Sequence, residues 1–195
     1  MNIQDLKIIG DSVSGSGANF ICLLDENGLY TGSYEWWMPE DGTGEDAGCW
    51  FDGDNWEKID VSLSDGQGFY IYTVDSGLTI QSAGAVKLTS YAKPLGVGYN
   101  IVGNCSPVDL DIQKIKIEGS SITGSGANFI CRLDADGVYA GSYEWWLPED
   151  GTGEDAGCWF DGDNWETIEA TIKAGEGLYL YTVDSGLTLT LPCAL

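Results

Sequence analysis

The sequence contains no histidine and only one arginine, Arg132. Without histidine, the usual general base, the Ser-His and Cys-His nucleophile pairs and most catalytic zinc sites are excluded. A pair of carboxylates, as glycosidases use, is still available, but the chain has 31 acidic residues, so finding such a pair says little about function. We therefore expect that the protein is not an enzyme.

Positive charge is also scarce. Eight basic residues stand against 31 acidic ones, which gives a net charge of −23. Such a field repels phosphate backbones and anionic membrane surfaces, and bidentate recognition of anions normally uses arginine. Nucleic acid is thereby excluded as a partner.

The chain has no apolar run approaching the roughly 20 residues that span a bilayer. Residues 1–10 lack the basic start and apolar stretch of a signal peptide. From the sequence as written we expect a soluble protein without membrane insertion. The absence of CxxC spacing, together with the lack of histidine, argues against a zinc site.

The main feature that is present is an internal repeat. A shift of 109 residues aligns Ile3 with Ile112 and keeps register without a gap to Thr79 and Thr188. Residues 32–56 differ from residues 141–165 at one position, whereas the next 25 residues agree at only 13. This uneven divergence indicates that something holds the middle segment fixed, either the packing of a tryptophan-rich irregular segment or its use as a working surface.

The repeat predicts two domains, a first module at residues 1–84 and a second at 85–195. The second copy is preceded by residues 85–110, which have no counterpart before the first copy. We therefore expect the first module either to be incomplete or to take its opening strand from elsewhere. An unpaired sheet edge is a template for another strand, so strand exchange between modules or chains is an expected consequence.

The fold class that the sequence predicts is all-β, with two tandem sandwich-like or barrel-like modules. Short β-branched or aromatic runs alternate with glycine, and no segment keeps a helical period for three turns. Because successive strand side chains point to opposite faces, we expect Trp36 in the core and Trp37 outside. The same alternation in residues 20–24 is interpreted to place Phe20 and Cys22 on the core face, with Leu23, which corresponds to Arg132, outside.

Outward-facing aromatic side chains are the candidate ligand-binding residues. Their flat rings and hydroxyl groups suit stacking and polar contact with a sugar or a protein partner. The competing interpretation is that these rings merely cover a half-buried β surface. The predicted residues are Trp37, Tyr70 and Tyr72 in the first copy and Trp146, Tyr179 and Tyr181 in the second.

Acidic, glycine-rich loops provide a candidate calcium site, because calcium takes six to eight oxygen ligands on a flexible loop. The spacing does not match an EF-hand, so a plain acidic surface is the alternative. The candidate ligands are Glu45, Asp46, Asp52 and Asp54, and in the second copy Glu154, Asp155, Asp161 and Asp163.

Six cysteines allow 15 pairings. The repeat symmetry suggests disulfides between Cys22 and Cys49, between Cys131 and Cys158, and between Cys105 and Cys193. For the two repeated pairs, buried free thiols are an equal alternative, because an unpaired cysteine acts as a small apolar residue.

The second copy resembles a loose group of modules in secreted and surface proteins of bacteria and archaea. The resemblance lies in GYNIVGN at 98–104, in GEGLYLYTVDSG at 175–186 and in the final LTLTLP. Those modules open with a GWN-type strand and close with a GxGYW-type or GxGFW-type strand before a final strand. The resemblance covers about 95 residues and implies a β fold, an extracellular or cell-surface location and a non-catalytic role.

Together these features predict an adhesion or binding protein that uses a repeated aromatic-acidic surface toward a protein or glycan on a cell or host surface. The alternative is a structural or self-assembling spacer, completed by strand exchange.

Overall fold

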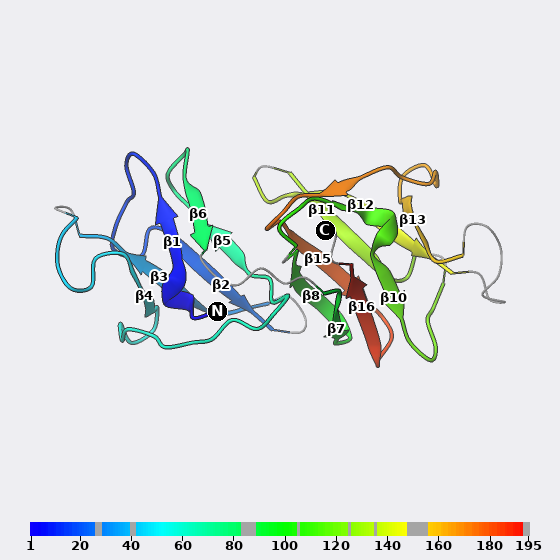
Figure 1. Ribbon diagram of the computed structural model, residues 1–195, viewed down its shortest axis with the longest axis horizontal. Helices are drawn as coiled ribbons and strands as arrows, with labels where there is room; N and C mark the ends of the chain where they lie inside the picture. Colours follow the sequence, from blue (N-terminus) through cyan, green and yellow to red (C-terminus); the bar gives the residue numbers. More distant parts are fainter. Residues whose placement is uncertain are drawn as a thin grey trace. The chain divides into compact units, whose positions relative to one another are not determined.

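The computed structural model describes residues 1–25, 29–39, 42–82, 89–104, 106–124, 126–134, 136–147 and 156–192. Strands and two short 3-10 helices make up its regular structure, so the prediction of an all-β chain is confirmed (Figure 1). The chain divides into two compact units, the first with the described residues up to Ser82 and the second with those from Thr89 onward. None of the sheets formed by the described residues closes into a barrel.

The first unit contains a four-stranded antiparallel sheet in the order β4-β3-β2-β5 and a two-stranded sheet, β1-β6. Its elements are η1 (Ile3–Asp5), β1 (Leu6–Ile9), β2 (Phe20–Leu24), β3 (Tyr30–Trp37), β4 (Cys49–Asp52), β5 (Tyr70–Tyr72) and β6 (Thr79–Ser82).

The second unit has a five-stranded sheet in the order β13-β12-β11-β15-β8, a three-stranded sheet, β10-β16-β7, and a two-stranded pair, β14-β9. Its elements are β7 (Tyr91–Leu95), β8 (Gly98–Gly103), β9 (Leu110–Asp111), η2 (Ile112–Lys114), β10 (Lys116–Glu118), β11 (Phe129–Leu133), β12 (Tyr139–Trp146), β13 (Cys158–Asp161), β14 (Thr171–Ile172), β15 (Gly177–Thr182) and β16 (Leu187–Leu191).

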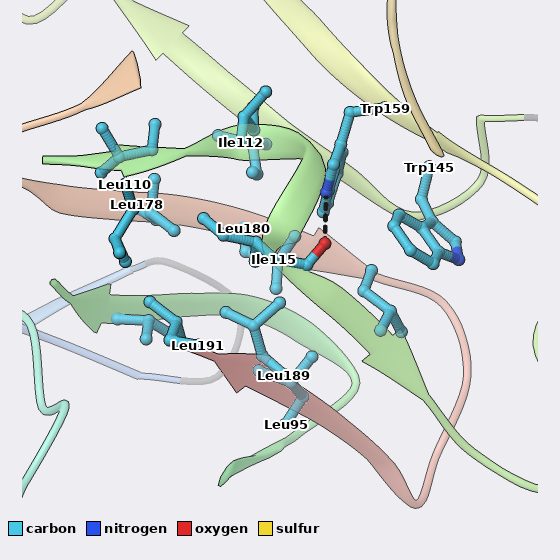
Figure 2. Close-up of a cluster of buried hydrophobic side chains, with 14 of the residues drawn as sticks. Leu95, Leu110, Ile112, Ile115, Trp145, Trp159, Leu178, Leu180, Leu189 and Leu191 are labelled. Carbon is cyan, nitrogen blue, oxygen red and sulfur yellow. Dashed lines mark hydrogen bonds between the residues drawn. The ribbon is translucent and has the colours of Figure 1, made fainter. Parts of the chain in front are cut away.

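The core of the second unit is built from both of its larger sheets (Figure 2). Trp145, Trp159 and Leu180 come from the five-stranded sheet, and Leu95 and Leu189 come from the three-stranded sheet. Burying such side chains contributes about 1.5–3 kcal/mol each, so this apolar layer is the main force that holds the two sheets together.

A buried tryptophan on an edge strand of each larger sheet, Trp50 on β4 and Trp159 on β13, is hydrogen-bonded to the backbone of the segment that follows the 3-10 helix. The indole Nε1 of Trp159 donates a hydrogen bond to the carbonyl oxygen of Ile115 at 2.9 Å (Figure 2). In the first unit, Trp50 Nε1 donates to Leu6 O at 2.8 Å. Each bond satisfies a buried indole N–H and fixes the orientation of the ring.

The 3-10 helices contribute one glutamine each to the same region. Gln4 Nε2 donates to the carbonyl oxygens of Trp50 and Ile59, both at 2.8 Å, while Gln4 Oε1 accepts from Trp50 N at 3.0 Å. Gln113 makes the same three bonds with Trp159 and Ile168. Each glutamine thereby hydrogen-bonds backbone groups of an edge strand, β4 in the first unit and β13 in the second.

The faces of β2 differ from the sequence interpretation. Ile21 is buried in the core of the first unit, so Phe20 and Cys22, which alternate with it, lie on the other face. Leu23 packs against the core, on the side of Ile21. The error came from Arg132, which replaces Leu23 in the second unit. Arg132 stays on the core side because its guanidinium lies over the Tyr143 ring, 5.1 Å from the centroid, and its charge reaches the margin of the sheet.

Candidate functional site

The outer face of the four-stranded sheet carries a row of side chains that crosses all four strands. The strand register places Glu35 of β3 opposite Phe51 of β4 and Phe20 of β2, and Phe20 opposite Tyr72 of β5. This face is the one turned away from Trp36, which is buried as predicted. The second unit repeats the row with Phe160, Glu144, Phe129 and Tyr181.

Next to this row, three rings form what we call the aromatic corner: Trp37, Phe51 and Trp56 in the first unit, and Trp146, Phe160 and Trp165 in the second. The rings of Trp37 and Trp56 are perpendicular, with centroids 5.9 Å apart and an interplanar angle of 87°. In the second unit the corresponding pair is 5.8 Å apart at 86°. A perpendicular pair offers two differently oriented ring surfaces, which suits a ligand that stacks on one ring while contacting the other.

The second tryptophan of the corner, Trp56, was not among the residues predicted from the sequence. It lies at the end of a tight loop in which Trp56 N donates to Asp52 O at 3.0 Å and Asp52 N donates to Glu57 O at 2.9 Å. Asp52 Oδ1 also accepts from Asp54 N at 2.9 Å. The sequence signal that could have found it is the bulky aromatic residue that ends the Asp-Gly-Asp-Asn turn.

The backbone of Trp56 adopts a left-handed conformation, with φ of 58°, and Trp165 does the same with φ of 57°. For a bulky residue this conformation is strained, and it is normally given to glycine or asparagine. Both rings are nevertheless about half exposed, at 47% for Trp56 and 48% for Trp165. Burial alone therefore does not account for the strained tryptophan in either unit.

Glu35 supplies a carboxylate beside the corner. A Cβ on Gly17 would lie 2.0 Å from Glu35 Oε2, and one on Gly53 would lie 3.0 Å from Oε1, so two glycines leave room for this side chain. Burial raises the pKa of Glu35; nearby Asp54 also raises it, while a hydrogen bond from Ser33 lowers it. The pKa of Glu144 is raised in the same way, with Asp163 as the neighbouring charge. A partly desolvated carboxylate is a strong acceptor for hydrogen-bond donors or cations brought by a ligand.

The tyrosines that were predicted as ligand residues lie on the same outer face but form a second group. Tyr72 stacks on Phe20 at 5.0 Å, and Tyr181 stacks on Phe129 at 5.2 Å. Trp37 lies on β3 and Tyr72 on β5, with β2 between them, so the corner and the tyrosines are separate contact points on one face. Tyr70 and Tyr179 are half-buried members of the same strands.

In the second unit, another ring covers the tyrosines. Tyr99 of β8 stacks on Tyr179 at 4.8 Å with an interplanar angle of 7°, and it meets Tyr181 edge-on at 4.9 Å. Tyr72 of the first unit is 52% exposed. The aromatic corners are therefore alike in the two units, whereas the tyrosine groups differ.

A depression of about 960 Å³ opens beside Trp37 in the first unit. The loop at residues 10–16 forms one wall, and Trp37, Met38 and Pro39 form the other. This loop is held by Asp75, whose carboxylate accepts from Ser14 N and Ser14 Oγ, both at 2.7 Å. Those bonds, with one from Asn19, lower the pKa of Asp75. Trp37 is thus shared between the aromatic corner and the depression.

Four of the described candidates for calcium ligands make other polar contacts. Asp46 pairs with Lys58 Nζ at 3.4 Å, and Asp52 caps its own turn. In the second unit Arg132 pairs with Asp161 at 3.7 Å and with Asp163 at 3.2 Å. Glu154 and Asp155 lie outside the described residues. Within those that are described, no group of three His, Cys, Asp or Glu side chains could hold a metal ion, and calcium binding stays a prediction.

The predicted disulfides of the repeated cysteines are not formed, and Cys22, Cys49, Cys131 and Cys158 are free thiols. Strand β3 lies between Cys22 and Cys49, with Ser33 opposite the first and Trp37 opposite the second. Two strand spacings of about 4.8 Å already exceed the roughly 7 Å limit between bridged Cα atoms. Burial raises the pKa of the Cys22 and Cys131 thiols. Cys105 and Cys193 lie outside the described residues.

Across the described parts of both units, no helix is long and apolar enough to cross a membrane. Comparisons with protein-family models, with curated proteins and with solved structures find no match for this chain.

Proposed function

We propose that the chain consists of two tandem sandwich-like modules, related by the 109-residue repeat, of a non-catalytic binding protein that acts outside the cell or on its surface. Each module binds a glycan or protein partner through its aromatic corner and the adjoining carboxylate. The extracellular location rests on the resemblance of the second copy to modules of secreted and surface proteins.

The observation that carries this proposal is the strained, half-exposed tryptophan at position 56 and again at position 165. A left-handed conformation costs a bulky residue about 1–3 kcal/mol, which persists when the surrounding structure enforces it and concentrates at functional sites. Glycine or asparagine would relieve the strain and keep the turn. A tryptophan that keeps this strained backbone while half of its surface stays in solvent is consistent with a ring that is retained for binding.

The chemistry of the surface supports a ligand that offers both an apolar face and hydrogen-bond donors. Sugar rings stack on tryptophan through their C–H faces and donate hydroxyl protons, and lysine or arginine side chains of a protein can do the same with their stems and charged ends. Glu35 supplies the acceptor, since its carboxylate lies on the row that adjoins the corner.

The test is a double replacement of the corner tryptophans, Trp56→Gly with Trp165→Gly, in the full chain. Glycine accepts the left-handed backbone, so we expect the two modules to keep their folds, whereas retention on a panel of immobilised glycans and cell-surface proteins should fall by at least about tenfold, equivalent to 1.4 kcal/mol. The matched control is Val74→Ala with Val183→Ala, which removes exposed apolar side chains outside the corner.

Retention that survives the tryptophan replacements would refute the aromatic corner as the binding surface. Retention lost equally in the valine control would show a non-specific apolar effect and would also contradict the proposal. Thermal unfolding of each variant shows whether the fold is intact.

A second candidate, a structural or self-assembling unit, is favoured by one specific observation: among the residues described in the first unit, β5 and β6 lie at the edges of their sheets.

A further inference from the structure

The two units differ most at one side of their sheets. In the second unit β15 is flanked by β11 and β8, and β16 is flanked by β10 and β7. The strands at the equivalent repeat positions of the first unit are β5 and β6. Among the described residues, β5 pairs only with β2, and β6 pairs only with β1.

The segment that makes the difference is a strand–turn–strand unit. Strand β7 pairs with β16 over five residue pairs, and β8 pairs with β15 over six. The two strands therefore add one strand to each sheet at the same side of the core. Leu95 of β7 and Val102 of β8 point into the core between the sheets, where Val102 is fully buried.

The first unit has no such segment among its described residues, and its apolar side chains at the equivalent positions are partly exposed to solvent. Ile80 of β6 is 38% exposed, whereas Leu189, at the equivalent position, is 0% exposed. All four residues of β6 are exposed, while β16 alternates between buried and half-buried residues. Phe69 and Ile71 are only partly buried against the core, whereas the equivalent Leu178 and Leu180 are buried.

We propose that the first unit is an acceptor for a strand–turn–strand segment of a separate partner protein, which adds one strand beside β5 and one beside β6. The second unit shows the chemistry of the occupant. The occupant carries apolar residues where Leu95 and Val102 lie, because these pack in the core, and an aromatic residue where Tyr99 lies, because Tyr99 meets Tyr181, whose counterpart Tyr72 is 52% exposed. Strand addition of this kind takes its affinity from main-chain hydrogen bonds and its specificity from alternate side chains.

A second copy of this chain is a poor occupant, because each chain has fewer segments to donate than edges to fill. Each chain has two acceptor sides, one in each unit, and one segment of the β7-β8 type among its described residues. If one chain gives its segment to the first unit of another, its own second unit is opened. Exchange between copies therefore leaves one acceptor open per chain and buries no additional surface.

Charge favours a neutral or basic occupant. The segment at residues 89–104 contains Lys93 and no acidic residue, whereas the whole chain has a net charge of −23. A partner with the same composition would approach the first unit without electrostatic repulsion, while a second copy of the chain would be repelled.

The experiment uses the full chain and a synthetic peptide with the sequence of residues 89–104. Hydrogen exchange followed by mass spectrometry is measured with and without the peptide. We expect the amides of β5 and β6 to exchange at least about tenfold more slowly with the peptide, because pairing suppresses local opening at the edges. A control peptide carrying Leu95→Asp and Val102→Asp should leave these rates unchanged, because it cannot bury its apolar face.

Three outcomes would overturn the proposal. One is unchanged exchange at β5 and β6 at millimolar peptide. Another is faster exchange of residues 91–103 in the chain, which would mean that the peptide replaces β7 and β8 in the second unit. The last is slower exchange at β5 and β6 that depends on the concentration of the chain alone, with an increase in its mass in solution, which would make a second copy the occupant.

Discussion

The two units share their internal contacts but not their sheet edges. The side-chain amide of Gln4 and that of Gln113 hold the same backbone groups, and Lys7 Nζ donates to Gly48 O as Lys116 Nζ donates to Gly157 O. Yet the first unit has a four-stranded and a two-stranded sheet where the second has five strands and three. The comparison shows that the repeated segment determines its own local structure, whereas cover for the core comes from β7 and β8, which lie outside the repeat.

The difference has an energetic consequence. An isolated pair of strands is marginal in water and depends on what it packs against. In the first unit β1-β6 is such a pair, whereas β16 in the second unit has a neighbour on each side. We therefore expect the same type of substitution to have different costs in the two units wherever β7 or β8 covers the residue.

We expect the largest difference in the free energy of unfolding between Leu189→Ala and Ile80→Ala, which truncate equivalent side chains. Leu189 is fully buried, so its replacement should lower the free energy of unfolding of the second unit by about 2–5 kcal/mol. Ile80 is 38% exposed, and its replacement should cost the first unit less, about 1 kcal/mol. Urea unfolding followed by tryptophan fluorescence measures both.

Thr188→Ala and Thr79→Ala serve as matched controls on the same strands, since these neighbouring side chains face away from the core side of β16 and β6. Equal costs for the Leu189 and Ile80 variants would contradict the view that β7 and β8 account for the difference between the units.

The next prediction concerns a pair of equivalent residues whose replacement should cost the two units the same free energy of unfolding. Asn19 and Asn128 are fully buried amides at equivalent positions. Asn128 Nδ2 donates to Thr123 O at 3.0 Å and Asn128 Oδ1 accepts from Val183 N at 3.1 Å, and Asn19 bonds to Ser14 O and Val74 N in the same way. Replacement by alanine leaves buried backbone groups unsatisfied, so each variant should lose about 1–3 kcal/mol.

The two losses are expected to agree within about 0.5 kcal/mol, because the hydrogen bonds described for the two asparagine side chains match and none of them reaches β7 or β8. Chemical unfolding of the two single variants and the double variant checks this. A loss confined to one unit would mean that the repeated contacts differ in strength despite their matching geometry.

The all-β fold class and several strand faces were predictable from the sequence. Period-two alternation placed Trp36 in the core and Trp37 on the opposite face, because strand geometry leaves only two faces. The same rule misplaced Phe20 and Cys22, since the arginine in the second copy was taken as a sign of solvent. A long side chain at the margin of a sheet keeps its charge in water while its stem stays on the core side.

Trp56 shows the other limit of sequence reasoning. Its part in the aromatic corner depends on a left-handed backbone at the end of a tight turn, which side-chain alternation does not report. The predicted pairing of Cys22 with Cys49 failed for a related reason. Repeat symmetry says that two cysteines are equivalent between copies, but the distance between them depends on β3, which intervenes in the sheet.

The smallest effect concerns the one substitution that changes charge between equivalent β2 and β11 positions. Arg132→Leu gives the second unit the residue that the first unit has at Leu23. The variant loses the ion pairs with Asp161 and Asp163 and the contact with Tyr143, but it gains an apolar side chain beside the core. Partly exposed pairs contribute about 0–1 kcal/mol, so the free energy of unfolding should change by no more than about 1 kcal/mol. The informative measurement is its salt dependence: added sodium chloride should stabilise the parent protein less than the variant, because only the parent has the two attractive ion pairs that salt screens. An identical salt response would show that these ion pairs contribute nothing to the second unit.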